Sequence, residues 1–173
     1  LEQLSEPLAA EADRLILPVA WAGDVPREFI DKTILELPRI LFSRREMDGL
    51  RAQLETARSL GFRHLLGGNL PAGELAAGQG FVLHGDFSLN TVNALAAAEL
   101  GELGFIDLTI APEGSLSSRM PLQAGLIAYG HLPLMVFRNH PAGMGGGDGF
   151  LTDRKRVKFP VSREAESSVL YNS

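Results

Sequence analysis

Polar side chains that could act as acids, bases or ligands follow several apolar runs of the sequence. The run Phe81–Leu83 leads directly into a polar segment that carries His84, Asp86, Ser88, Asn90 and Asn93. Other apolar runs are followed by Asn69, Glu113, Arg138, Asn139 and His140. In parallel α/β folds, ligands bind at the C-terminal ends of the strands. We therefore expect these side chains to line one pocket.

Three of these residues, His84, Asp86 and Glu113, are the candidates for catalysis. His84 and Asp86 are two residues apart, so within a strand they would point to the same face. Such a pair could hold the imidazole in one tautomer for general-base work or help to bind a metal, and the alternative is a structural hydrogen bond. A triad with Ser88 is disfavoured, because the three residues lie too close together and no Gly-x-Ser-x-Gly motif is present.

The remaining polar residues are assigned to binding. We expect substrate contacts from Asn69, Asn90, Asn93, Arg138 and Asn139. The alternative is structural, because Asp and Asn side chains often cap helices. The basic cluster Arg154, Lys155, Arg156 and Lys158 also has two interpretations, a solvated edge strand or a contact with an anion or RNA.

The elements that would position these residues alternate between strands and helices. Strands are expected near residues 15, 35, 62, 81, 105 and 132. A capping box at Ser43 and Glu46 begins a helix that Gly61 ends. A second helix is expected from Asn90 to about Leu103, with Leu95 and Leu103 on its apolar face.

Alternating strands and helices predict an α/β fold with a parallel sheet. A complete eightfold barrel needs about 250 residues. Because the chain has 173 residues, we expect a partial or truncated TIM-type (β/α) barrel over residues 1–139. Residues 140–173 would form a Gly-rich loop and an irregular C-terminal extension that packs on or near the barrel.

Composition and charge restrict the class of protein. The net charge of −5 gives no global basic field to attract nucleic acid. No apolar run approaches the roughly 18 residues of a membrane span, and no signal peptide is visible, so a cytoplasmic protein without a membrane partner is expected. The absence of cysteine excludes disulfides and thiolate metal sites.

The first residue of the sequence and the expected partial barrel both lead us to expect a partner for this chain. The sequence starts at Leu1 without Met, as a fragment would. A partial barrel also leaves an open edge of unpaired backbone groups. We therefore expect a homo-oligomer or contact with a missing N-terminal half.

Several motifs, in their order along the chain, resemble the collagenase-like peptidase family, peptidase family U-32. They are Leu37-Pro38-Arg39-Ile40, Gly67-Gly68-Asn69-Leu70, Asp86-Phe87-Ser88-Leu89-Asn90-x-x-Asn93, Ala111-Pro112-Glu113, Tyr129-Gly130-His131-Leu132-Pro133, Arg138-Asn139-x-Pro141, Leu151-Thr152-Asp153-Arg154-Lys155, Phe159-Pro160-Val161 and Asn172-Ser173. The similarity covers most of the chain and is greatest to the large multi-repeat bacterial members. It implies the C-terminal part of a barrel-type fold.

Two kinds of activity are implied by this resemblance. One is metal-associated proteolysis of collagen-like substrates, and the other is hydroxylation of RNA bases or ubiquinone precursors with an iron–sulfur cluster on four cysteines. This chain has His140 where the relatives have a cysteine, and Arg156 where they tend to have glycine. Cluster ligation needs thiolates. We therefore expect no cluster held by this chain alone. One alternative is a divalent metal bound by His84 and His140 in its place, and another is a cluster whose ligands come from another chain or a missing segment.

The functional expectation is a peptidase-like domain that acts on a peptide or an RNA-related substrate. Its pocket would lie at the C-terminal strand ends. The alternative is a non-catalytic binding or scaffold domain that has kept the fold and lost the cofactor.

Overall fold

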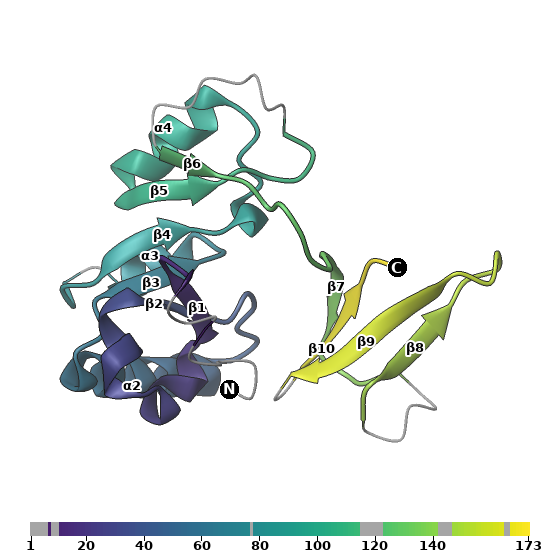
Figure 1. Ribbon diagram of the computed structural model, residues 1–173, viewed down its shortest axis with the longest axis horizontal. Helices are drawn as coiled ribbons and strands as arrows, with labels where there is room; N and C mark the ends of the chain where they lie inside the picture. Colours follow the sequence, from purple (N-terminus) through teal and green to yellow (C-terminus); the bar gives the residue numbers. More distant parts are fainter. Residues whose placement is uncertain (1–6, 8–10, 77, 115–122, 142–146, 165–166) are drawn as a thin grey trace. The chain divides into compact units, whose positions relative to one another are not determined.

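The computed structural model describes residues 7, 11–76, 78–114, 123–141, 147–164 and 167–173. By its contacts the chain divides into two compact units, Leu1–Ile127 and Ala128–Ser173 (Figure 1). In the described part of the chain, no helix is long and apolar enough to cross a membrane. Most of the Gly-rich loop, at 142–146, lies outside the described residues.

The first unit is built on a sheet of six parallel strands, as the alternating pattern predicts. The strands follow chain order across the sheet. They are β1 (Leu15–Pro18), β2 (Thr33–Glu36), β3 (His64–Gly67), β4 (Val82–Gly85), β5 (Phe105–Thr109) and β6 (Gln123–Gly125). The five expected strands from 15 to 105 are confirmed.

The strand expected near residue 132 is present, but it belongs to a different sheet. This strand, β7 (Pro133–Phe137), pairs antiparallel with the C-terminal strand of the chain. The sixth parallel strand is β6, whose sequence Gln-Ala-Gly carries no apolar pattern. The parallel strands therefore end before Ile127, whereas the sequence pattern led us to extend them to residue 139.

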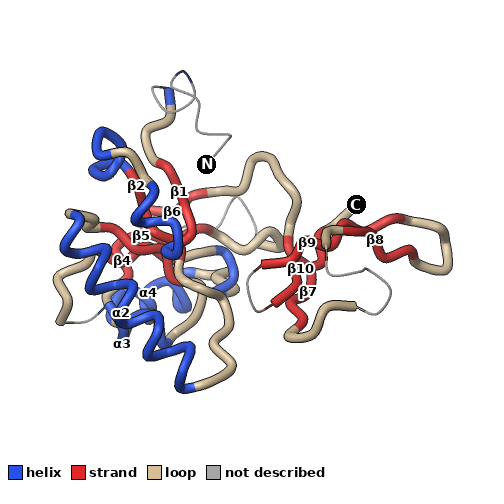
Figure 2. Tube along the Cα trace, turned by 90° about the horizontal axis from the view of Figure 1, so that it is seen from below, coloured by secondary structure: helices blue, strands red, loops and turns tan. Residues whose placement is uncertain are grey.

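Helices lie along one side of the parallel sheet (Figure 2). They are the 3₁₀ helices η1 (Val19–Asp24), η2 (Arg27–Lys32) and η3 (Phe87–Leu89) and the α-helices α2 (Arg44–Leu60), α3 (Pro71–Ala76) and α4 (Ala94–Glu102). The core forms where helix side chains meet alternate strand residues such as Leu17, Leu35, Leu65 and Leu83. Since strand side chains alternate, the intervening residues face away from the helices.

We call this second surface the helix-free face. It carries Ile16, Ile34 and His64, which share one row of the sheet, and His84 and Asp107, which share another row two residues further along the strands. Ile16 is 53% exposed, whereas Leu17 beside it belongs to the core. The sheet thus has one apolar packed surface and one surface with polar groups.

Helix α2 begins and ends where the sequence predicts. Ser43 accepts a hydrogen bond from the Glu46 amide at 3.3 Å, and the Glu46 carboxylate accepts one from the Phe42 amide at 2.6 Å. Gly61 ends the helix with φ of 106°, in the left-handed region that glycine adopts without strain. The face bearing Leu50 is buried.

Helix α4 differs from the expected helix. It begins after Asn93, whose side chain accepts from the Ala96 amide at 2.9 Å. Asn90 instead closes η3 with φ of 54°. The buried residues are Ala97 and Leu100. Leu95, which was expected on the packed face, is 74% exposed, because the face that meets the core is the one that carries Ala97 and Leu100.

The second unit is a four-stranded antiparallel sheet, and it is more regular than the extension expected from sequence. Its order is β7-β10-β9-β8, with β8 (Gly149–Thr152), β9 (Lys158–Glu164) and β10 (Ser167–Tyr171). The basic cluster lies at the connection between β8 and β9. There Asp153 accepts from the amides of Lys155 and Val157 at 2.8 and 2.9 Å, while Arg156 has φ of 66°.

We predict that Arg156→Gly stabilises the second unit. A non-glycine residue in the left-handed region costs about 1–2 kcal/mol, and the greater freedom of glycine in the unfolded chain offsets part of this gain. The expected increase in the free energy of unfolding is about 0.5–1 kcal/mol, measured by urea denaturation. The matched control is Lys155→Gly, because Lys155 is not among the positive-φ residues. The account is wrong if both variants lose stability equally.

Candidate functional site

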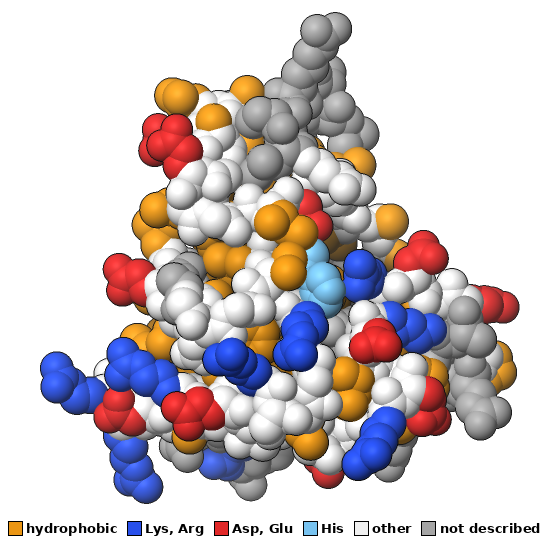
Figure 3. Space-filling view, turned by 90° about the vertical axis from the view of Figure 1, so that its left-hand side faces the viewer, with side chains coloured by type: hydrophobic (Ala, Val, Ile, Leu, Met, Phe, Trp, Pro, Cys, Tyr) orange, Lys and Arg blue, Asp and Glu red, His pale blue; other side chains and the backbone are white. Residues whose placement is uncertain are grey.

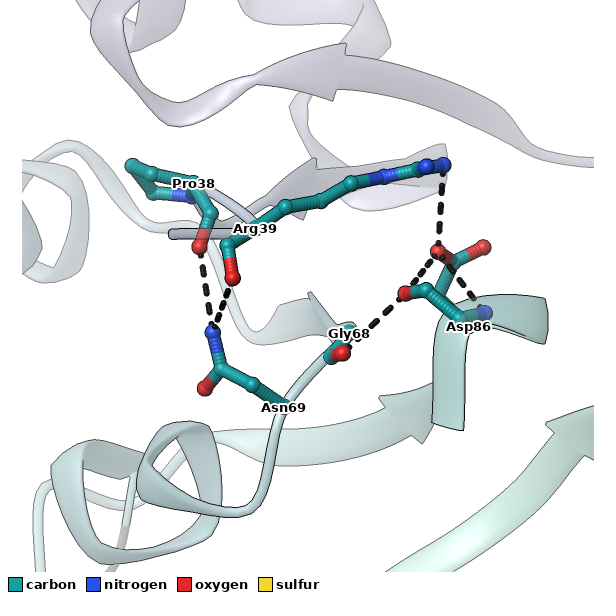
Figure 4. Close-up of polar contacts among 6 residues, drawn as sticks. Pro38, Arg39, Gly68, Asn69 and Asp86 are labelled. Atoms are coloured by element: carbon teal, nitrogen blue, oxygen red, sulfur yellow. Dashed lines mark hydrogen bonds and ion pairs between the residues drawn. The ribbon is translucent and has the colours of Figure 1, made fainter. Parts of the chain in front are cut away.

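Asp86 lies at the C-terminal edge of the parallel sheet, just beyond β4, and connects three loops (Figure 4). Its Oδ2 is 2.7 Å from Ser88 Oγ and 3.5 Å from a nitrogen of the Arg39 guanidinium. The same oxygen accepts from the Ser88 amide at 3.4 Å and so caps η3. Asp86 is 7% exposed. It therefore organises the edge of the sheet and also supplies charge to it.

Asn69, on the loop after β3, holds the loop after β2 at this edge (Figure 4). Its Nδ2 donates to the carbonyl groups of Pro38 and Arg39 at 3.3 and 2.8 Å. Its Oδ1 accepts from the Ala72 amide at 3.0 Å, at the start of α3. Asn69 thus holds the backbone that carries Arg39.

The Arg39 side chain is oriented by two neighbours. Its guanidinium carbon lies 4.5 Å from the centre of the Phe87 ring, a cation–π distance, and one of its nitrogens lies 3.5 Å from Asp86 Oδ2. The side chain is 24% exposed. This half-buried cation is the group at the edge best placed to meet a ligand.

Gly68 permits the close approach of the β3 and β4 loops. Ser88 Oγ lies 3.1 Å from the Gly68 carbonyl. A Cβ at Gly68 would overlap Ser88 Oγ. Only glycine therefore allows the Ser88 hydroxyl to reach Asp86 from this position.

A second polar group lies on the helix-free face, across three adjacent strands. His84 Nδ1 is 2.8 Å from Asp107 Oδ1, and His84 Nε2 is 2.9 Å from His64 Nδ1. His84 is buried, whereas the Asp107 side chain is 34% exposed. The three side chains form one continuous chain of hydrogen bonds, which we call the histidine chain.

The expected pairing of His84 with Asp86 is wrong. Strand β4 ends at Gly85, so Asp86 no longer follows the alternation that would place both side chains on one face. The carboxylate that pairs with His84 comes instead from Asp107 on β5. The two candidates for catalysis are therefore parts of separate hydrogen-bond networks.

The environment of His64 disfavours its charged form. Burial lowers the pKa of His64 below its ordinary value of 6.5, and the electrostatic effects of His84 and Arg14 lower it further, against an opposing effect of Asp107. Figure 3 shows one face of the molecule on which histidine lies at the surface beside Lys or Arg side chains. His64 is therefore mainly neutral at neutral pH.

The other expected residues of the first unit lie apart from these networks. Asn93 caps α4, and Asn90 adopts the left-handed conformation after η3. Both are exposed, as is Glu113 in the turn after β5. The two asparagines thus have the structural roles that were the alternative to substrate binding, and the Glu113 side chain is exposed to solvent.

The second unit contains Arg138, Asn139 and His140. The first two are exposed residues that follow β7. His140 Nδ1 lies 2.7 Å from Ser168 Oγ, and its Nε2 is buried without a hydrogen-bond partner among the described residues. No group of three His, Asp or Glu side chains suited to a metal occurs within the described ranges. His140 offers one nitrogen for a metal ligand.

Sequence reasoning missed His64, Asp107 and Arg39. The signal for the first two was a polar side chain inside an apolar run, in His64-Leu65-Leu66 and Phe105-Ile106-Asp107. The signal for Arg39 was a basic residue shortly after a strand. None of the three could be paired with a partner before the strand registers were known.

A pocket of about 610 Å³ lies elsewhere on the first unit, at the start of α2. It is lined by Leu41, Phe42, Ser43, Arg44, Met47, Asp48 and Arg51. None of the residues expected to function lines it. Its lining consists of the cap and first turns of a helix, so we assign it no role.

Comparison with known proteins gives no match: no family model, no curated protein and no solved structure is similar to this chain.

We predict that Gly68→Ala weakens the C-terminal edge. The added methyl group displaces Ser88 Oγ, and overpacking of this kind costs about 1–3 kcal/mol. The free energy of unfolding from urea denaturation measures the loss. Gly49→Ala is the control, because nothing lies within 4 Å of its Cβ and it stands inside α2, where alanine is favoured by about 1 kcal/mol. Equal stability of the Gly68 variant and the unmutated chain would contradict this packing.

We also predict that His64 makes the fold sensitive to acid. Its pKa in the folded state is below the ordinary value of 6.5, so the unfolded chain binds protons more readily. This contribution to stability is complete above pH 6.5 and is lost as the pH falls through the folded-state pKa. Urea denaturation over this range should show a smaller loss for His64→Gln than for the unmutated chain. Identical losses would mean that His64 does not contribute.

Proposed function

We propose that the first unit is part of a TIM-type (β/α) barrel and that the chain acts on peptides as a hydrolase of the peptidase class. The strand order supports the barrel. Strands of a barrel follow chain order inside an outer layer of helices, whereas a doubly wound sheet reverses its order. Here all six strands are parallel and sequential, with helices along one side.

The observation that carries the proposal is the position of Arg39 at the C-terminal edge. Among the described residues, the hydrogen-bonding contact of the Arg39 guanidinium is the long one to Asp86, at 3.5 Å. A guanidinium has five N–H donors in a planar fork that matches a carboxylate. With Phe87 and Asp86 holding its plane, Arg39 has donors left for the carboxylate or carbonyl oxygens of a peptide.

The reaction itself, hydrolysis of a peptide, follows from the resemblance to the collagenase-like peptidases. A divalent metal at His140, self-association or contact with an N-terminal half, an RNA-related substrate and a cytoplasmic location stay predictions. The strand ends near Asp86 and Asn69 would form the floor of the substrate site in this proposal.

The second candidate is a peptide-binding domain without catalysis. It is favoured by the bonding of Asp86, whose Oδ2 already contacts Ser88 and Arg39. A carboxylate used in this way orients loops and is less available for proton transfer to a substrate. The two candidates share the binding step at Arg39 and differ in whether the peptide is cleaved.

We predict that Arg39→Ala weakens peptide binding. The probe is a synthetic Gly-Pro-Ala repeat peptide with a free C-terminal carboxylate, and its affinity is measured by calorimetry. Loss of a hydrogen bond to a charged group costs about 1.5–3 kcal/mol, which is a decrease in affinity of about 10- to 100-fold. Arg45→Ala, at an exposed position of α2, is the control.

The outcome also separates the two candidate functions. Mass spectrometry of the incubated peptide shows fragments if the chain is a peptidase and intact peptide if it only binds. If Arg39→Ala and Arg45→Ala bind the peptide equally well, the assignment of the site to Arg39 is wrong.

A further inference from the structure

At the Asp107 end of the histidine chain, the position of the proton follows from the hydrogen bonding. The Asp107 carboxylate only accepts hydrogen bonds, and both of its oxygens lie within 2.9 Å of His84 Nδ1. His84 must therefore carry a proton on Nδ1. In a neutral imidazole the other nitrogen, Nε2, is then an acceptor.

The other end of the histidine chain is the His64 ring. Since His84 Nε2 accepts, His64 must donate from Nδ1, which leaves the lone pair of His64 on Nε2. No hydrogen bond to this nitrogen occurs among the residues that the structure describes. His64 is partly exposed, whereas His84 is buried. The basic nitrogen of the chain thus lies at its accessible end.

We propose that His64, His84 and Asp107 form a proton relay in which His64 Nε2 is a general base for water at the helix-free face. As the water oxygen attacks a carbonyl group, Nε2 takes one proton from the water. The Nδ1 proton of His64 moves to His84 Nε2, and the resulting imidazolium is stabilised by the Asp107 carboxylate. The reverse movement delivers the proton to the leaving group.

The surroundings of His64 suit this role. The charged and titratable groups acting on it are His84, Arg14 and Asp107, and together with burial they lower its pKa. The ring is therefore unprotonated and able to accept at neutral pH. In the same row of the sheet, buried Ile34 lies beside His64 on the neighbouring strand, and Ile16, which is 53% exposed, provides apolar surface one strand further. The expected substrate class is a small ester with an apolar group.

This inference goes beyond the proposed function and concerns a different hydrogen-bond network. Arg39 and Asp86 belong to the hydrogen-bond network at the strand ends, and none of the hydrogen bonds given for the histidine chain includes them. Peptide binding at Arg39 can therefore fail while the relay is retained, and the reverse also holds.

The test is hydrolysis of p-nitrophenyl acetate by the full chain, followed as release of p-nitrophenolate. We expect His64→Gln and Asp107→Asn each to lower the protein-dependent rate by about 100-fold, the lower end of the contribution of a positioned general base. His131→Gln is the matched control, because His131 is exposed and contacts only the Asn172 carbonyl among the described residues. It should retain the full rate.

The pH dependence of the unmutated chain tests the relay without any substitution. The rate should rise with deprotonation of His64, with its inflection below pH 6.5. Asp107→Asn distinguishes a relay from an isolated surface histidine, which would react equally well without the carboxylate. The proposal is overturned if His64→Gln or Asp107→Asn keeps the full rate, or if the unmutated chain shows no inflection below pH 6.5.

Discussion

The hydrogen bond between His84 and Asp107 depends on an irregularity in the pairing of β4 with β5. Leu83 is in register with Phe105, but His84 is in register with Asp107, so Ile106 is an extra residue in the ladder. Ile106 is 53% exposed. Without this shift, an isoleucine would stand beside His84 and the imidazole would lack its carboxylate. A bulge that redirects one side chain in this way is a common device near functional sites.

The C-terminal end of β4 also leads into the hydrogen-bond network around Asp86 and Arg39. Immediately after the strand ends, Asp86 turns toward Arg39 and Ser88, whereas His84 faces the neighbouring strands. Gly68 makes this possible by leaving space for Ser88 at the β3 loop. Strand β4 therefore carries His84 of the histidine chain on the face of the sheet. It also leads into Asp86, which contacts the Arg39 guanidinium at the strand ends. The two networks use different carboxylates, so each carboxylate is matched to one cation or imidazole.

Much of the first unit was predictable from local patterns. Apolar runs between polar segments located five parallel strands, and the cap at Ser43 and the stop at Gly61 located α2. Pairing across strands was not predictable, because Asp107 reaches His84 only through the register shift. The strand near residue 132 has the same apolar composition as a parallel strand, and its antiparallel partner β10 lies far along the chain. Composition cannot distinguish these two pairings. The proposed peptidase activity rests on motif resemblance, whereas the proposed binding at Arg39 and proton transfer at His64 are argued from geometry.

The central claim is that the protons of the histidine chain lie on Nδ1 of His84 and on Nδ1 of His64. Two-dimensional ¹H–¹⁵N NMR of the imidazole rings in the full chain measures this directly, because protonated and unprotonated ring nitrogens have distinct ¹⁵N shifts. We predict unprotonated Nε2 nitrogens on both rings, with the assignment made by comparison with His64→Gln. Protons on both nitrogens of His84, or a proton on His64 Nε2, would contradict the account, since His64 would then have no lone pair to act as a base.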